Sequence, residues 1–217
     1  MNALIFAAGK GERMRPLTEH TPKALLEVRG KPLIEYHIVA LRRAGILRIV
    51  INTGWLGEQL PQRLGAGERF GVDICYSHEG PEPLETGGGM RRALALLGTD
   101  PFIATNADIY TDFDYARLSS PVGLAHLVLV DNPPHHPRGD FAFDGERVHV
   151  CGSARLTFAG IGVYRPELIS HFPDGRYPLA PILKEAMDFG IVTGEHFCGA
   201  WTDVGTPERL AGLNANM

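Results

Sequence analysis

The sequence predicts an α/β protein with a mostly parallel, mixed sheet and helices on both faces. In the first half of the chain, patterns of buried strand alternate with patterns of amphipathic helix. The second half is richer in apolar and β-branched strand patterns. Because no repeat, low-complexity run or linker separates the halves, we expect one domain over residues 1–217.

The first half begins with a short apolar strand over residues 4–8. Apolar residues at helical spacing after Pro32, followed by a stop at Gly45, predict a helix over 32–44. Pro61 weakens or kinks the short helix expected over 56–64. The other expected elements are strands over 47–52, 72–76 and 101–105 and a helix over 88–97.

In the second half, an apolar strand over 124–130 precedes a hairpin. The pair Asp144-Gly145 is a turn signal between strands over 141–143 and 147–150. Further patterns predict a strand over 158–164, an amphipathic helix over 179–189 and a return to the sheet over 191–201. A hydroxyl followed by a proline, Thr206-Pro207, predicts the start of a last helix.

Composition excludes several function classes. The formal net charge of −4 gives no general attraction to nucleic acid or to an anionic membrane. Cys75, Cys151 and Cys198 are odd in number and lack Cys-x-x-Cys spacing, so we expect reduced, mostly core cysteines without a structural zinc site. No apolar stretch approaches the roughly 20 residues of a membrane-spanning helix. The N-terminus lacks a signal-peptide pattern, and a cytoplasmic protein is expected.

The most informative segment is the loop after the first strand, residues 7–18 (AAGKGERMRPLT), which is followed by Pro22-Lys23. Glycines at 9 and 11 allow backbone N–H groups to approach an anion closely. Arg13, Arg15 and Lys23 add positive charge. The loop lacks both Gly-x-Gly-x-x-Gly and Gly-x4-Gly-Lys-Ser/Thr, which disfavours a dinucleotide-binding fold and a P-loop. The combination predicts a triphosphate-binding loop.

Three segments follow the carboxyl ends of predicted parallel strands: the loop 9–23, the turn after Tyr76, and residues 106–108. Ligands of parallel sheets bind at this edge. We therefore expect the three segments to line one crevice.

These motifs together resemble those of the sugar-1-phosphate nucleotidyltransferase family. Beside the loop, the matching segments are Leu84-Glu85-Thr86-Gly87-Gly88-Gly89, Asn106-Ala107-Asp108, Arg138-Gly139-Asp140-Phe141 and Trp201-Thr202-Asp203-Val204-Gly205-Thr206. The resemblance covers nearly the whole chain. It implies the nucleotide-diphospho-sugar transferase fold, which is Rossmann-like, with a nucleotide-binding half at about 1–110 and a sugar-binding half at about 111–217.

The family joins a nucleoside triphosphate to a sugar 1-phosphate and releases pyrophosphate. The resemblance implies a Mg²⁺-dependent enzyme that uses UTP and N-acetylmuramic acid 1-phosphate in the recycling of cell-wall sugars, as a monomer or weak dimer. Guanylyl transfer to mannose 1-phosphate, and uridylyl or thymidylyl transfer to glucose 1-phosphate, are alternatives within the enzyme class. A catalytically idle binding subunit with the same fold is the alternative from another class.

The resemblance also implies roles for the matching residues. Asp108 and Asp203 are expected to hold Mg²⁺, which commonly takes one or two carboxylates together with phosphate oxygens. Lys23 is expected on the α-phosphate and the sugar phosphate, and Arg13 on the leaving pyrophosphate, so Lys23, Arg13 and Asp108 form the catalytic set. The nucleotide-binding set is Ala7, Ala8, Gly9, Gly11, Arg13, Arg15, Lys23, Glu79 and Gly87. The sugar-binding set is Asn106, Gly139, Asp140 and Gly160.

Recognition of the base is expected from the backbone at 7–9 and from the segment 79–87, in which Glu79 would accept a hydrogen bond from uracil N3–H. The glycines at 87–89 would let the base or ribose approach a helix N-terminus closely. The chain departs from many relatives at Glu85, where glycine is common, and at 151–155, where a Glu-Lys pair is missing. Arg155 is a candidate to replace that pair.

Other polar residues have structural interpretations. Asp112 and Asp114 match the cap and first turn of a helix. His135 and His136 are expected to be loop residues and not metal ligands, because adjacent histidines point in different directions. Trp55 is expected to pack partly buried.

Overall fold

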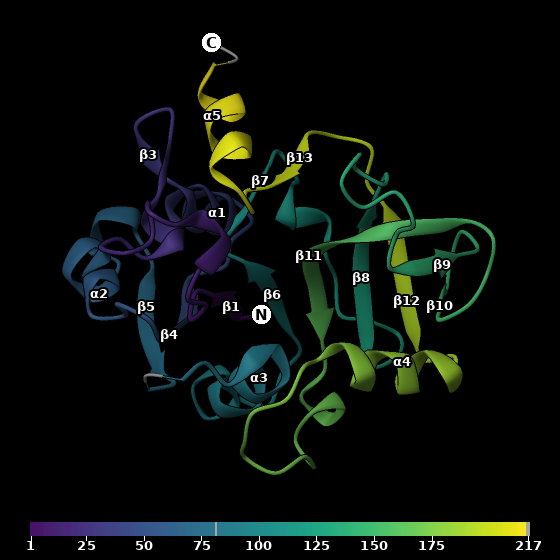
Figure 1. Ribbon diagram of the computed structural model, residues 1–217. Helices are drawn as coiled ribbons and strands as arrows, with labels where there is room; N and C mark the ends of the chain where they lie inside the picture. Colours follow the sequence, from purple (N-terminus) through teal and green to yellow (C-terminus); the bar gives the residue numbers. More distant parts are fainter. Residues whose placement is uncertain (81, 216–217) are drawn as a thin grey trace.

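The structure is a computed structural model that describes residues 1–80 and 82–215. Figure 1 shows a central sheet with helices on both of its faces. The strands lie in the order β12 (Val192–His196), β8 (Ala125–Val130), β11 (Arg155–Tyr164), β6 (Phe102–Asn106), β1 (Ala3–Phe6), β4 (Arg48–Thr53) and β5 (Asp73–His78). A hairpin of β9 (Phe141–Phe143) and β10 (Val148–His149) pairs with the first residues of β11.

The strand directions give the sheet a parallel part and a mixed part. β6, β1, β4 and β5 are parallel, so their carboxyl ends reach the same edge. β11 runs antiparallel to both of its neighbours, β6 and β8, while β12 is parallel to β8. The mixed α/β fold predicted from the sequence is therefore confirmed.

Side-chain alternation along β1 explains why both faces carry helices. Ile5 packs in one cluster with Ile34 and Ile38 of α1 (Leu33–Arg43). Leu4 points the other way, into a cluster with Met90 of α3 (Glu85–Leu97). That second cluster continues across the sheet to Leu183 of α4 (Ala180–Asp188). A strand that is apolar on both faces must be covered twice to bury its side chains.

Smaller elements lie around this framework. They are the two-stranded sheets β2 (Glu27–Val28) with β3 (Lys31–Pro32) and β7 (Ile109–Thr111) with β13 (Trp201–Asp203), the helices α2 (Gln59–Leu64) and α5 (Pro207–Ala215), and the 3₁₀ helices η1 (Glu12–Met14), η2 (Lys23–Leu25), η3 (Glu68–Phe70), η4 (Tyr115–Arg117) and η5 (Pro166–Leu168). None of the described helices is long and apolar enough to span a membrane.

The predicted return to the sheet over 191–201 is confirmed only for the first part of this segment. β12 ends at His196, and the Phe197 N–H makes one more bond, of 2.8 Å, to the Leu129 carbonyl. The chain then leaves the central sheet and forms β13, which pairs antiparallel with β7 so that Asp203 lies opposite Ile109. This change of partner brings residue 203 next to the end of β6.

Two helix starts also differ from the prediction. α1 begins at Leu33 because Pro32 is extended and belongs to β3. α3 begins at Glu85, three residues before the predicted start at 88, because the Tyr177 carbonyl accepts the otherwise free N–H groups of Gly87 and Gly88, at 3.0 and 3.1 Å. The hairpin around Asp144-Gly145 and the helix start at Pro207 are confirmed.

The three cysteines are free, as expected, but they are not mostly core residues. Cys75 is half-buried, and Cys151 and Cys198 are exposed. Both exposed cysteines lie in loops, where no sheet or helix face covers them.

Candidate active site

A cleft at the carboxyl edge of the parallel strands brings together the three segments that the sequence predicts to share a crevice. A cavity of about 220 Å³ in this cleft is lined by the ends of β1 and β6, by the glycine loop and by the segment after β5. Its lining is Phe6, Ala7, Ala8, Gly9, Lys23, Ala24, Asn52, Glu79, Pro83, Glu85, Thr86, Asn106, Ala107 and Asp108. The expected crevice is therefore confirmed.

The glycine loop has a compact local structure. Gly11 has a φ of 63°, and its carbonyl accepts bonds from the Met14 N–H and the Thr18 hydroxyl, both at 2.8 Å. A Cβ at Gly11 would lie 3.0 Å from the Thr18 side chain, so a larger residue would strain this turn. These hydrogen bonds fix the conformation of the loop, and the side chains of Arg13 and Arg15 are exposed.

A second cavity, of about 670 Å³, extends the cleft along this loop. It shares Lys23 and Asp108 with the first cavity and adds the exposed side chain of Arg13 and that of Arg176. Arg15 is exposed and lines neither of the two cavities. Cations around a cavity of this size suit the several negative charges of a triphosphate.

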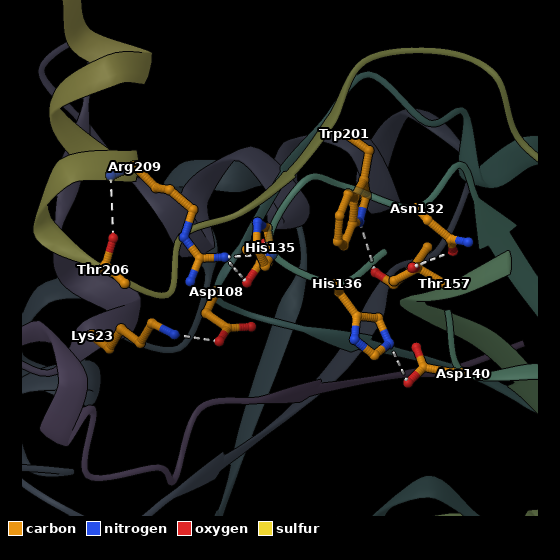
Figure 2. A network of polar contacts seen from close by, with 12 residues as sticks. Lys23, Asp108, Asn132, His135, His136, Asp140, Thr157, Trp201, Thr206 and Arg209 are labelled. Carbon is orange, nitrogen blue, oxygen red and sulfur yellow. Dashed lines mark hydrogen bonds and ion pairs between the residues drawn. The ribbon is translucent and has the colours of Figure 1, made fainter. Parts of the chain in front are cut away.

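Lys23 and Asp108 form an ion pair in the middle of the cleft (Figure 2). The Lys23 side chain is only 14% exposed, and that of Asp108 is 36% exposed. Lys23 is the first residue of η2, and Asp108 follows β6 directly. The two side chains therefore neutralise each other's charge. Both line the cavity, where a ligand group of opposite charge can replace the partner of either one.

Asp203 lies beside this pair through the β7–β13 contact, since the Val204 N–H donates to the Asp108 carbonyl at 2.7 Å. Its Oδ2 accepts a hydrogen bond from Arg209. Its Oδ1 is 2.8 Å from His135 Nε2, yet this buried oxygen accepts no well-aligned hydrogen bond from the described residues. Figure 2 shows Arg209 and His135 meeting at this point.

The two acids fit a divalent cation that is shared with phosphate. Within residues 1–80 and 82–215, no three His, Cys, Asp or Glu side chains are grouped closely enough to hold a metal by themselves. Mg²⁺ needs fewer protein ligands than that, because phosphate oxygens and water complete its shell. An under-bonded carboxylate oxygen on Asp203 is a suitable ligand atom.

Glu79 is tied into a network that joins three strand ends. Its Oε1 accepts a bond of 2.5 Å from the Asn52 amide, and its Oε2 accepts one of 2.7 Å from the Leu84 N–H. The Asn52 Oδ1 accepts the Ala7 N–H at 2.6 Å. Burial raises the pKa of Glu79 against the opposing effect of these bonds. No motif in the sequence selects Asn52, because it is the last residue of a predicted apolar strand.

The glycines at 87–89 pack against protein. A Cβ at Gly87 would lie 2.7 Å from the Tyr177 ring, and one at Gly88 would lie 2.0 Å from the Gly175 carbonyl oxygen. A Cβ at Gly89 would lie 2.4 Å from Glu79 Oε1. Gly87 does not line the first cavity, and its neighbours Glu85 and Thr86 do. Of the segment 79–87, Pro81 lies outside the described residues.

Two of the predicted sugar residues are in contact. Gly160 has a φ of 76° and interrupts the regular pairing of β11, and a Cβ there would lie 2.6 Å from Asn106 Nδ2. Asn106 lines the first cavity. A glycine at 160 therefore makes room for the Asn106 amide at the end of β6.

The other two predicted sugar residues lie on the loop before β9. Asp140 Oδ2 accepts the Phe158 N–H at 2.8 Å, and its Oδ1 is 3.0 Å from His136 Nε2 (Figure 2). Gly139 has a φ of 59°, and a Cβ there would lie 2.6 Å from Asn132 Oδ1. The Asp140 carboxylate is thus fixed in place by partners from two directions.

The adjacent histidines do point in different directions, as expected, but each contacts a predicted site acid: His135 contacts Asp203 and His136 contacts Asp140. Arg155 does not offer a free charge. Its guanidinium donates to the carbonyls of Arg138, Val150 and Asp140, and so it holds this loop together.

The structural interpretations of the remaining residues are mostly confirmed. Asp114 caps η4 by accepting the Ala116 N–H at 3.0 Å, whereas Asp112 is not part of that cap. Trp55 is half-buried, and its indole N–H donates to the Thr18 carbonyl at 3.1 Å.

Comparisons with known proteins show similarity over most of the chain. The N-acetylmuramate alpha-1-phosphate uridylyltransferase of Neisseria meningitidis serogroup B is 48% identical, over 97% of this chain and 95% of its own length. The protein of the same name from Caulobacter vibrioides is 32% identical, over 99% and 96%. The mannose-1-phosphate guanylyltransferase catalytic subunit beta of Danio rerio is 29% identical over 96% of this chain, which spans 62% of that protein.

Solved structures share the fold. A putative glucose-1-phosphate thymidylyltransferase from Bacillus anthracis superposes with a TM-score of 0.86 at 22% identity, covering 99% of this chain and 94% of that one. HddC from Yersinia pseudotuberculosis, complexed with GMP-PN, gives a TM-score of 0.78 at 20% identity, covering 99% and 98%. The family model for nucleotidyl transferases matches residues 2–122. This chain therefore belongs to the nucleotidyl transferase family.

Proposed function

We propose that this chain transfers the uridylyl group of UTP to the 1-phosphate of N-acetylmuramic acid, giving the UDP-sugar and pyrophosphate. One observation carries the choice of substrates: the 48% identity with the Neisseria meningitidis protein of that activity extends over 97% of this chain. It agrees with a cleft in which the Lys23–Asp108 ion pair lines two adjoining cavities, the second of which is also lined by Arg13.

In the proposed reaction, an oxygen of the sugar phosphate forms a bond to the α-phosphorus of UTP. The bond from that phosphorus to the α–β bridging oxygen breaks, and pyrophosphate leaves with the electron pair. Because every reacting group is an anion, the barrier is mainly electrostatic and positional, and no protein nucleophile is required.

Each site residue then has a task in charge stabilisation. Lys23 is proposed to leave Asp108 and bind the α-phosphate, where negative charge accumulates in the transition state. Arg13, on the second cavity, is proposed to stabilise the departing pyrophosphate. Asp108 and Asp203 would hold Mg²⁺, which would supply further neutralisation of the phosphate charge.

The proposed base contacts are based on the cavity lining, and the proposed sugar contacts are based on the family resemblance. Uracil is proposed to meet the backbone at 7–9 and the carboxylate of Glu79, whose oxygens keep free lone pairs beside their two bonds. The sugar is proposed to lie toward Asn106 and Gly160, with Asp140 at its hydroxyl groups.

The test is pyrophosphate release from the purified chain with a panel of substrates. N-acetylmuramic acid, glucose and mannose 1-phosphates are each combined with UTP, GTP and dTTP, with Mg²⁺ and with a chelator. We expect the highest kcat/KM for UTP with N-acetylmuramic acid 1-phosphate, and no turnover with the chelator. A preference for GTP with mannose 1-phosphate would reassign the substrates, and release from no pair would favour an idle binding subunit. The expected cytoplasmic location and monomeric or weakly dimeric state stay predictions, open to fractionation and sedimentation.

A further inference from the structure

Both predicted metal carboxylates carry a cation of the protein itself. Lys23 pairs with Asp108, and Arg209, at the start of α5, donates to Oδ2 of Asp203. The Arg209 side chain is 20% exposed and packs over the backbone at Gly205, where a Cβ would lie 2.5 Å from the guanidinium. The contact is therefore made by a mostly buried arginine whose side chain is held in place by its surroundings.

A divalent cation and this guanidinium compete for the negative charge of Asp203. A metal on Oδ1 or Oδ2 would place two further positive charges within a few ångströms of Arg209, in a partly buried site where repulsion is poorly screened. His135 Nε2 already lies 2.8 Å from the guanidinium and 2.8 Å from Oδ1, so the nearest neighbour offers Arg209 no compensating negative charge. Metal binding at Asp203 therefore weakens the Arg209 contact and favours its release.

The displaced guanidinium stays next to the place where a second anion enters. Arg209 lines a cavity of about 710 Å³ together with Asn132, His135, Trp201, Asp203 and Thr206. Among the described residues that line this cavity, Arg209 is the one lysine or arginine. Trp201 connects the cavity to the predicted sugar residues, because its indole N–H donates to the Ala159 carbonyl at 2.9 Å, next to Gly160.

The sugar phosphate is expected to contact Lys23, and a second cation would offset the charge of this anion further. A sugar 1-phosphate that approaches a bound triphosphate meets strong repulsion between phosphates, which fixed positive charge must offset. Arg13 lies along the triphosphate cavity, and Arg155 is occupied by three carbonyl oxygens. On the side of β13, the available guanidinium is that of Arg209.

We propose that Arg209 is a substrate-binding residue that exchanges the Asp203 carboxylate for the phosphate of the sugar 1-phosphate when a divalent cation binds Asp203. The inference rests on the proposed nucleotidyl transfer for its substrate. It adds an order of binding to that function, because Arg209 becomes available only after the metal has bound the Asp203 carboxylate. The site would thus bind the sugar phosphate well only when it is already loaded with metal and nucleotide.

The experiment compares the wild-type chain with Arg209→Met, with Arg209→Lys, and with a matched control, Arg48→Met. Arg48 is an exposed arginine at the start of β4, and it lies 4.0 Å from the Asp73 carboxylate. Free Mn²⁺ is measured by electron paramagnetic resonance in the absence of substrates, and KM is measured separately for UTP and for N-acetylmuramic acid 1-phosphate with Mg²⁺.

Without the competing guanidinium, Arg209→Met is expected to bind Mn²⁺ at least about threefold more tightly than wild type, while Arg48→Met does not. Its KM for the sugar phosphate is expected to rise about tenfold or more, with the KM for UTP changed less than about twofold. Arg209→Lys is expected to recover part of the sugar-phosphate affinity.

Mn²⁺ affinity that is unchanged or weaker in Arg209→Met overturns the exchange at Asp203. An unchanged KM for the sugar phosphate overturns the phosphate contact. Arg209→Gln replaces the methionine variant if thermal melting shows that the latter is unfolded. If the wild-type chain releases no pyrophosphate from any substrate pair, the proposed function fails, and the Mn²⁺ measurement still decides whether Arg209 competes for Asp203.

Discussion

Replacing Asp108 by asparagine separates the chemistry of the site from its stability. Asp108→Asn keeps the size of the side chain and removes one negative charge from beside Lys23. Two charges 4 Å apart attract by about 4 kcal/mol at an effective dielectric constant of about 20, before desolvation is subtracted. Because the Asp108 side chain is 36% exposed, solvent offsets much of this, and we expect a net loss of stability of about 1–2 kcal/mol.

This loss is small compared with the expected loss of activity. A domain of this size changes its Tm by roughly 2–4 °C per kcal/mol, so a calorimetric scan should show a decrease of about 2–8 °C. With a total stability on the order of 10 kcal/mol, nearly all molecules remain folded at 25 °C. Loss of a metal carboxylate in the transition state is expected to reduce kcat/KM by at least about 100-fold, which is about 2.7 kcal/mol.

The control is Asp114→Asn, the same chemical change on a nearby acid that caps η4. Asparagine is as good a cap as aspartate, so both Tm and kcat/KM should stay close to wild type. If Asp108→Asn retained kcat/KM within about threefold of wild type in the presence of Mg²⁺, Asp108 would be removed from the metal site and from the catalytic set.

Three further outcomes are expected. Glu79→Gln leaves one of the two donors of that carboxylate without an acceptor, at a cost of about 1–3 kcal/mol, and should raise the KM for UTP by about fivefold or more; an unchanged KM contradicts it. Gly88→Ala puts a Cβ 2.0 Å from a carbonyl oxygen and should lower the Tm, whereas Gly212→Ala, with nothing within 4 Å, should raise it slightly. Burial lowers the pKa of His37 to about 4, below its ordinary 6.5, so the stability that its neutral form contributes is complete above pH 6.5 and is lost as pH falls toward 4. Urea midpoints between about pH 7 and pH 4.5 should fall by less in His37→Gln than in wild type, and equal slopes would remove His37 as the cause.

The sequence predicted the fold well where a single local pattern decides the structure. The strand β1 and the hairpin of β9 and β10 follow from apolar runs bounded by glycine-containing turns, and the structure has them within one or two residues. The loop after β1 was recognised because glycines and cations occur together in it. In these segments, a residue's neighbours in sequence are also its neighbours in space.

The segment 191–201 shows where local patterns fail. The segment contains no proline, so no local signal ends the predicted return to the sheet before residue 201. In the structure the chain changes its pairing partner from β8 to β7, a strand of three residues that has no clear signal of its own. Pairing of this kind is a long-range contact, and it depends on which edge is free once the central sheet has formed.

The glycines at 87–89 were interpreted as room for a ligand, and the structure fills that room with Tyr177, Gly175 and Glu79. Close approach of a backbone has the same sequence signature whether the other partner is a ligand or the protein. Tyr177 is far from α3 in sequence, so no pattern near the glycines could distinguish the two.

Arg209 was missed for a related reason. It follows Thr206-Pro207 in an ordinary helix start, where an arginine normally faces solvent. Its position becomes informative only because β13 sets Asp203 beside Asp108, so that the first turn of α5 directs a guanidinium back toward the cleft. In the site proposed for metal and phosphate, the arrangement has a clear physical effect. A buried carboxylate without a counter-ion would destabilise the unliganded protein, and one with a permanent counter-ion would bind metal poorly. An arginine on a helix end, with a second anion to receive it, satisfies both conditions.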